Sequence, residues 1–186
     1  MSFVQAIRKN WPGILAVALG LVWIWVSRAP EGATTAGGIP APQAGFLAPA
    51  ISLTTLEGET VALADLRGQV VLVNIWATWC PPCRAEMPAI QRAYETYHKQ
   101  GFVVLAVNST VQDDAAKIPT FVAEYRLTFP ILLDGDGAVT RLYKVASLPS
   151  SFFIGRDGII REVVIGGPMD EALLKTRIET LLKEKP

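Results

Sequence analysis

The sequence predicts an α/β domain built around a mixed β-sheet, and three observations support this prediction. Two continuous β-branched runs, Gln69–Ala77 and Phe102–Asn108, have the composition of central strands that are buried on both faces. A helix-forming segment from about Cys80 to Lys99 lies between them, as in a strand–helix–strand unit. A later hairpin, with its turn at Asp157 and Gly158, supplies antiparallel strands.

The other elements follow from turn and cap signals. Residues 51–63 alternate around Glu57 and Gly58, which is typical of a β-hairpin. Gly101 ends the first helix in the C′ position, and Pro119 marks the first turn of a second helix that ends near Arg126. Three further elements complete the domain: a short strand at Phe129–Asp134, a helical turn at Val139–Tyr143 and an amphipathic helix at Asp170–Leu182.

Composition limits the classes of function. The chain has 186 residues, enough for one well-buried domain and an additional segment. Basic and acidic residues balance at 17 each, so nothing favours a polyanion, and a nucleic-acid partner is not expected. The mean hydropathy of +0.33 is raised by the N-terminal residues.

Those residues predict a membrane anchor. Residues 1–10 form a short basic segment, and residues 11–27 contain the uncharged run Trp11–Val26. As a helix this run is roughly 24 Å long, against about 30 Å for a hydrocarbon core, and tryptophans at both ends suit the two interfaces. A cleaved signal peptide is the alternative, but bulky residues end the run. A buried core helix is disfavoured by Pro12 and by the all-round apolar surface.

The arrangement that follows is a single-pass protein with its domain outside the cell membrane. Arg8 and Lys9 precede the apolar run and only Arg28 follows it, which favours an N-terminus inside. Residues 28–45 are rich in Gly, Pro and Ala and predict a flexible tether. The folded domain is then expected at residues 46–186.

The two cysteines, Cys80 and Cys83, are the only ones in the chain. A zinc site needs about four ligands, and the chain offers no third Cys and a single His, so no metal is expected. Attachment of a c-type haem needs His directly after the second Cys, where Arg84 stands. A copper-delivery site needs a distant loop His, which is also absent from the sequence.

Two interpretations of the cysteine pair remain: a structural disulfide, or staple, and a redox pair. A staple across so short a loop would contribute only roughly 2 kcal/mol to the stability of the fold. The redox interpretation fits the spacing, because one helical turn brings residues i and i+3 within disulfide distance. The helix N-terminus stabilises a thiolate on Cys80, which becomes the accessible attacking group, and Cys83 becomes the resolving thiol. Pro81 and Pro82 adjust this preference by fixing φ and removing donors.

Taken with its flanks, the stretch VVLVNIWATWCPPCRAEMP resembles the active-site strand and helix of thioredoxin-fold proteins. It is most similar to the membrane-tethered TlpA/ResA group of extracytoplasmic thiol–disulfide oxidoreductases. The segments FPILLDGDGAVTRLYKV and SLPSSFFIGRDGIIREVVIGG resemble the second half of that group. The resemblance covers nearly all of Phe46–Leu182. It implies a thioredoxin-like fold with an N-terminal β-hairpin and a central insert.

The resemblance also assigns roles to single residues. Cys80 and Cys83 match the redox pair, which serves in place of a cofactor. Pro149 matches a cis-proline that lies against the disulfide, and Glu86 matches the acidic residue of ResA-like members. A partly buried Glu86 would have a raised pKa and exchange protons with a thiol. The residues expected to contact substrate are Trp79, Pro81, Pro82, Leu148 and Pro149.

Two features concern the neighbourhood of the pair. Asn74 stands where thioredoxin carries a buried Asp, so any proton relay must use Glu86 or water. Trp76 and Trp79 are expected to shield the site, although core packing explains Trp76 equally well. Pro88 cannot donate to the carbonyl of Arg84, so a kink in the helix is expected there.

The function expected from the resemblance is reduction of protein disulfides, commonly of apocytochrome c, with electrons from a membrane thiol reductase. A peroxiredoxin-type peroxidase is one alternative. It needs Thr or Ser three residues before the reactive Cys and a Pro further back, where Ala77 and Val73 stand. The other alternative is a redox-inert binding module with a structural disulfide.

Overall fold

A computed structural model of the chain describes residues 17, 19–20, 23 and 38–184. The chain divides into two units, and the domain lies in the second, Ala36–Pro186. The basic segment expected at residues 1–10 and most of the transmembrane segment expected at 11–27 lie outside the described residues. Within the described part of the chain, no helix has the length and apolar character needed to cross a membrane.

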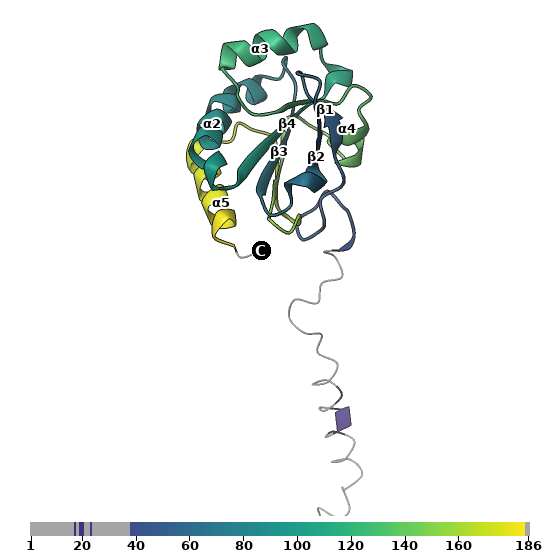
Figure 1. Cartoon of the computed structure of the whole chain (residues 1–186). Coiled ribbons are helices and arrows are strands. Elements are labelled where there is room, and N and C mark those ends of the chain that lie inside the picture. Colours follow the sequence, from purple (N-terminus) through teal and green to yellow (C-terminus); the bar gives the residue numbers. More distant parts are fainter. Residues whose placement is uncertain (1–16, 18, 21–22, 24–37, 185–186) are drawn as a thin grey trace, which may run out of the picture. The chain divides into compact units, whose positions relative to one another are not determined.

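The centre of the domain is a five-stranded sheet with the strand order β5-β4-β3-β6-β7 (Figure 1). The central strand β3 (Val70–Trp76) is parallel to β4 (Phe102–Asn108) and antiparallel to β6 (Ser150–Ile154). The edges are β5 (Ile131–Leu133) and β7 (Ile160–Ile165). Every residue of β3 is buried, as expected for a strand covered on both faces. The predicted mixed sheet is confirmed.

Two layers cover this sheet. The first consists of three helices: α2 (Pro81–Tyr97), α3 (Ile118–Tyr125) and α5 (Glu171–Lys183). The second consists of the hairpin β1 (Ser52–Thr54) and β2 (Thr60–Ala62) together with α4 (Ala138–Leu142). Figure 1 shows α2 and α5 on one side of the sheet and α4 with the hairpin on the other. Successive β3 residues alternate between the layers: Leu72 packs in the first core and Val73 in the second.

The predicted elements are present, with ends shifted by a few residues. Gly101 closes the turn after α2 with φ at 90°, the left-handed value expected of a C′ glycine. Pro88 lies inside α2. The described part of the chain also contains short 3₁₀ helices that were not predicted, among them η2 (Leu63–Leu66), η3 (His98–Gln100), η4 (Thr110–Gln112) and η5 (Ala115–Lys117). Together with α3, η4 and η5 form the segment between β4 and β5, which is called the central insert below.

The folded chain begins before the boundary expected at residue 46. The Gly45 N–H donates to the carbonyl of Ile160 at 2.8 Å, and the Ala48 N–H donates to that of Gly158 at 2.9 Å. Part of the segment assigned to the tether therefore lies along the β6–β7 hairpin. An extended Pro-rich chain can satisfy the hydrogen-bonding groups of such an edge without the alternating apolar pattern that marks a strand, so no sequence pattern indicates this pairing.

Candidate active site

Cys80 and Cys83 form a disulfide at the start of α2, directly after the central strand. Their sulfurs are 2.07 Å apart and their Cα atoms 5.3 Å apart. Cys80 is the N-cap of α2, and its Sγ accepts a hydrogen bond of 3.3 Å from the Cys83 N–H. Pro81 and Pro82 occupy the first helical positions, where a backbone N–H would have no partner within the helix. The helix N-terminus is therefore aimed at the reactive pair.

Neither sulfur-bearing residue is open to solvent in this oxidised form. Cys80 is 2% exposed and Cys83 is 0% exposed. The sequence predicted Cys80 as the accessible thiol, and the disulfide form does not show that accessibility. Cys80 is still the residue nearer the surface, because its neighbours Trp79 and Pro81 are both exposed, whereas Cys83 lies one turn deeper in the helix.

Glu86 lies one helical turn after Cys83 and is completely buried. Its Oε1 accepts a hydrogen bond of 2.8 Å from the side-chain amide of Asn74, and its Oε2 accepts one of 3.0 Å from the Met169 N–H. Burial raises the pKa of Glu86 from 4.5 to about 7, and the bonds from Met169 and Asn74 offset only part of that rise. The carboxyl group therefore changes its protonation near neutral pH, where a general acid or base is most effective.

Asn74 joins this carboxyl group to the sheet. It is buried in the middle of β3, and its Nδ2 donates a second hydrogen bond, of 2.9 Å, to Oγ of Ser151 on β6. Its Oδ1 has no hydrogen-bond partner among the described residues. Because an amide does not titrate, Glu86 is the member of this group that can take up a proton.

The expected cis-proline is found beside Glu86. The Leu148–Pro149 peptide bond is cis, Pro149 is buried, and Leu148 is half-buried. Gly167 packs between the two groups: a Cβ atom on it would lie 2.9 Å from Oε2 of Glu86 and 2.9 Å from Cγ of Pro149. The loop after β7 therefore lies against both the carboxyl group of Glu86 and the ring of Pro149.

The two tryptophans differ in their surroundings. Trp76 is fully buried and its ring centroid lies 4.7 Å from that of Phe121, so core packing accounts for it. Trp79 is 56% exposed, and its Nε1–H donates to the carbonyl of Gln112 at 2.8 Å. It lines a cavity of about 420 Å³ together with Arg84 and residues of the insert. This exposure suits contact with a bound protein better than the expected shielding.

Sequence reasoning missed Asp113, a residue of the insert. Its carboxylate accepts hydrogen bonds from the backbone N–H and the hydroxyl of Thr78, at 2.6 and 2.5 Å. No local pattern marks this residue, because Thr78 lies far from it in the sequence. Only folding brings Asp113 next to the turn before Cys80.

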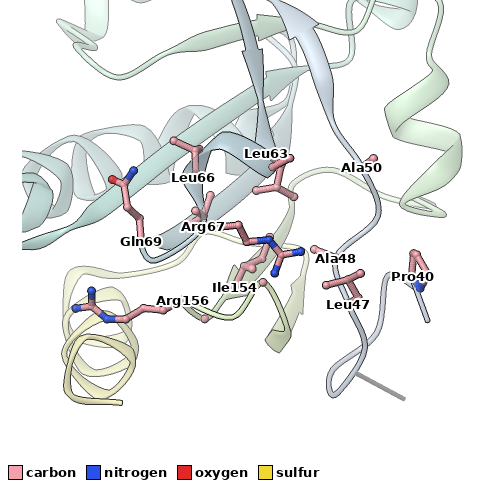
Figure 2. Close-up of a pocket in the computed structure, with 14 residues that line it drawn as sticks. Pro40, Leu47, Ala48, Ala50, Leu63, Leu66, Arg67, Gln69, Ile154 and Arg156 are labelled. Carbon is pink, nitrogen blue, oxygen red and sulfur yellow. The ribbon is translucent and has the colours of Figure 1, made fainter. Parts of the chain in front are cut away.

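The described residues offer no other site of comparable chemistry. Nowhere in the described ranges do three or more His, Cys, Asp or Glu side chains form a group that could hold a metal ion. A second cavity, of about 160 Å³, is lined by Leu47, Arg67, Ile154 and neighbouring residues (Figure 2). It lies near the first residue of β3, whereas the disulfide follows the last, about 20 Å away along the strand. This cavity is therefore separate from the redox pair.

The fold and the cysteine pair define a thiol–disulfide oxidoreductase of the thioredoxin-like class. The reactive Cys-x-x-Cys begins a helix after a central parallel strand, and a cis-proline precedes the antiparallel hairpin. Residues 44–163 match the model of the AhpC/TSA family, and the chain belongs to that family.

Individual relatives agree with this class. The thiol-disulfide oxidoreductase ResA of Geobacillus thermodenitrificans is 37% identical over 137 residues, which cover 74% of this chain and 77% of the relative. The crystal structure of StoA from Bacillus subtilis is 30% identical, with a TM-score of 0.61, and the match covers 69% of this chain and 96% of that one. A secreted disulfide oxidoreductase of Mycobacterium tuberculosis, homologous to DsbE, is 28% identical with a TM-score of 0.64, covering 70% and 94% of the two chains.

Proposed function

We propose that this protein is a membrane-anchored, extracytoplasmic reductant of protein disulfides, that apocytochrome c cysteines are among its targets, and that a membrane thiol reductase supplies its electrons. One observation carries the proposal. A buried carboxyl group, Glu86, lies one helical turn beyond a redox pair at a helix N-terminus and titrates near neutral pH. Such a group suits a pair that must release and recapture protons in each cycle.

The reaction proceeds by two thiol–disulfide exchanges. The Cys80 thiolate attacks one sulfur of the partner's disulfide, which forms a mixed disulfide and releases the first partner thiolate. The Cys83 thiol then gives up its proton to the Glu86 carboxylate, and its sulfur attacks Cys80 within the mixed disulfide. The second partner thiolate leaves; one partner thiolate takes the proton held by Glu86, and the other takes one from the solvent, which received the Cys80 proton when its thiolate formed. The partner gains two electrons and two protons, and the protein is left with the Cys80–Cys83 disulfide.

The reductive direction is proposed because the resemblance to the TlpA/ResA group implies it, and it requires an electron donor. In an oxidising environment the Cys80–Cys83 pair would remain closed unless an electron donor reopened it. The extracytoplasmic location is supported by the apolar run Trp11–Val26, by the charges around it and by the secreted relative. Apocytochrome c is proposed as a target because the resemblance to the TlpA/ResA group implies it.

Two alternative functions have less support. A peroxidase of the peroxiredoxin type needs a hydroxyl group where Ala77 stands, and both Ala77 and Val73 are buried apolar residues. A redox-inert binding module would have no use for a buried carboxyl group with a raised pKa beside its disulfide. Reduction of insulin with dithiothreitol as electron source separates a redox-inert module from a reductase.

Trapping tests the substrate class. In a Cys83→Ala variant the mixed disulfide on Cys80 is not resolved, so partner proteins accumulate as adducts that dithiothreitol releases. We expect apocytochrome c among them, and no adduct with a Cys80→Ala/Cys83→Ala control. If wild-type protein reduces insulin but the Cys83→Ala variant captures only proteins without haem-binding cysteines, cytochrome c is not a target.

Protease accessibility tests the location. The domain should be digested when protease is added to intact spheroplasts, and a cytoplasmic marker should survive the same treatment. A domain that is protected until the membrane is broken would contradict the proposed topology. Recovery of the domain in the medium, with a new N-terminus in the tether, would instead show that the segment is cleaved.

A further inference from the structure

The turn that leads into Cys80 is held by the central insert. It consists of residues 77–80, between the end of β3 and the first residue of α2. Both polar donors of Thr78 are used by one side chain, because its N–H and hydroxyl donate to Oδ2 and Oδ1 of Asp113. Its carbonyl accepts a hydrogen bond of 3.3 Å from the guanidinium of Arg84. Thr78, itself buried, therefore has no unused polar group.

The neighbouring residue is held from the same segment. Trp79 donates from Nε1 to the carbonyl of Gln112, and Gln112 is fixed in turn by a bond of 3.1 Å from its side-chain amide to Oγ of Ser109. Two consecutive residues of the insert thus hold two consecutive residues of the turn.

Asp113 is itself anchored to the sheet. Its Oδ2 accepts a hydrogen bond of 2.8 Å from the side chain of Asn108, the buried last residue of β4, and its Oδ1 accepts one of 2.8 Å from the Asp114 N–H. Burial alone would raise the pKa of Asp113, but the hydrogen bonds from Asn108, Thr78 and Asp114 outweigh it and hold the pKa below its ordinary value. The carboxylate is therefore charged at neutral pH and accepts four hydrogen bonds.

We infer that Asp113 is a positioning residue for Cys80, acting through Thr78. The N-cap geometry of Cys80, in which its sulfur meets the Cys83 N–H, depends on where the turn delivers the Cys80 main chain. Thr78 lies two residues upstream, and Asp113 fixes it at two points. Loss of either hydrogen bond frees the turn, so the sulfur spends less time facing the helix N-terminus and less time aligned for attack. The inference rests on the proposed thiol–disulfide exchange and adds the device that aligns its attacking group.

Thr78 offers the cleaner test, because its replacement leaves the charge of Asp113 in place. Thr78→Val removes only the hydroxyl donor, and Thr78→Ser keeps it. The test uses the full chain, purified in detergent and reduced. In it, Thr78→Val should raise the pH at which the rate of Cys80 alkylation by iodoacetamide is half of its maximum. It should also lower kcat for insulin reduction by about tenfold with little change in KM. Thr78→Ser should behave like the wild type in both measurements.

A double-variant cycle tests whether Asp113 acts on Cys80 through Thr78. If Asp113 acts through Thr78, the effects of Asp113→Ala and Thr78→Val on alkylation should not add, and the double variant should resemble Asp113→Ala alone. The control is Asp157→Asn, an exposed residue of the β6–β7 turn whose side chain accepts a hydrogen bond from the Ile159 N–H; it should leave the alkylation profile and kcat unchanged.

Two results would overturn the inference. One is a Thr78→Val variant that is less stable than the wild type but keeps the wild-type alkylation profile and kcat. This result would mean that the Asp113–Thr78 contact is structural only. The other is additive effects in the double variant. Alkylation requires no partner protein, so the alkylation measurements decide the inference even if the wild type reduces no protein disulfide. Failure of the wild type to reduce any protein disulfide would count against the proposed function instead.

Discussion

The side-chain amide of Asn74 donates a hydrogen bond of 2.8 Å to Oε1 of Glu86, which joins the central strand to the helix that carries the redox pair. Neither end of this bond carries a fixed positive charge. The carboxyl group is therefore held by neutral donors in a buried place, the condition under which its neutral form competes with its charged form.

Replacement of Glu86 by Gln should change the chemistry of the thiols. A carboxylate near a thiol opposes formation of a second negative charge, so Glu86→Gln should lower the apparent thiol pKa in the reduced protein. It also removes the proton acceptor for Cys83, so turnover with insulin should slow by about tenfold or more. Titration of thiolate absorbance and steady-state kinetics measure the two effects. Unchanged values in both would make Glu86 an ordinary buried side chain.

The same variant should change how stability depends on pH. The folded state raises the pKa of Glu86 from 4.5 to about 7 and thus favours the protonated form. The stability that this preference contributes is fully present below pH 4.5 and is lost as the pH rises through 7. Relative to Glu86→Gln, the oxidised wild type should lose about 3 kcal/mol of unfolding free energy between pH 4 and pH 9. Urea unfolding at several pH values measures this, and parallel curves for the two proteins would refute it.

Gly167 should tolerate no side chain. A Cβ atom there meets Oε2 of Glu86 and Cγ of Pro149 at 2.9 Å each, so Gly167→Ala must displace one of them. We expect a loss of about 1–3 kcal/mol in stability and a change in the pH dependence described above. Gly135→Ala is the matched control, since a Cβ atom at Gly135 meets nothing within 4 Å. Equal denaturation midpoints for the two variants would show that the loop simply moves aside.

The two thiols should differ in reactivity once the disulfide is reduced. Both cysteines belong to the core, but Cys80 is the N-cap and has exposed neighbours, while Cys83 lies inside the helix. Iodoacetamide at neutral pH should therefore label Cys80 first, which peptide mass spectrometry after brief labelling can show. Preferential labelling of Cys83 would mean that the helix N-terminus does not select the attacking thiol.

The strands and helices could be predicted because each depends on a local pattern. The β-branched run before Cys80 forms β3 and is buried throughout, and the Asp157–Gly158 pair turns the β6–β7 hairpin with Gly158 at a φ of 78°. In such segments the side chains that specify the element lie within the element or next to it.

The surroundings of the site could not be predicted, because they are made by residues distant in the sequence. Glu86 is buried by a loop that begins after β7 and donates the Met169 N–H, and no periodicity in α2 reveals that loop. The spacing of three residues placed Glu86 one helical turn from Cys83, but its acid–base role came only from a resemblance. The hydrogen bond from the Thr78 N–H to Asp113 joins residues that are 35 positions apart, and no sequence pattern indicated it.

The pairing of the N-terminal chain with the β6–β7 hairpin determines where force enters the domain. Gly45 and Ala48 bond to that hairpin near its turn, which lies beside the first residues of β3, and the disulfide lies beyond the last. Anything that holds the protein by residues before 38 therefore pulls on the end of the sheet opposite Cys80. The described N-terminal chain therefore meets the sheet at the end opposite Cys80, and a pull applied through that chain reaches the domain at this opposite end.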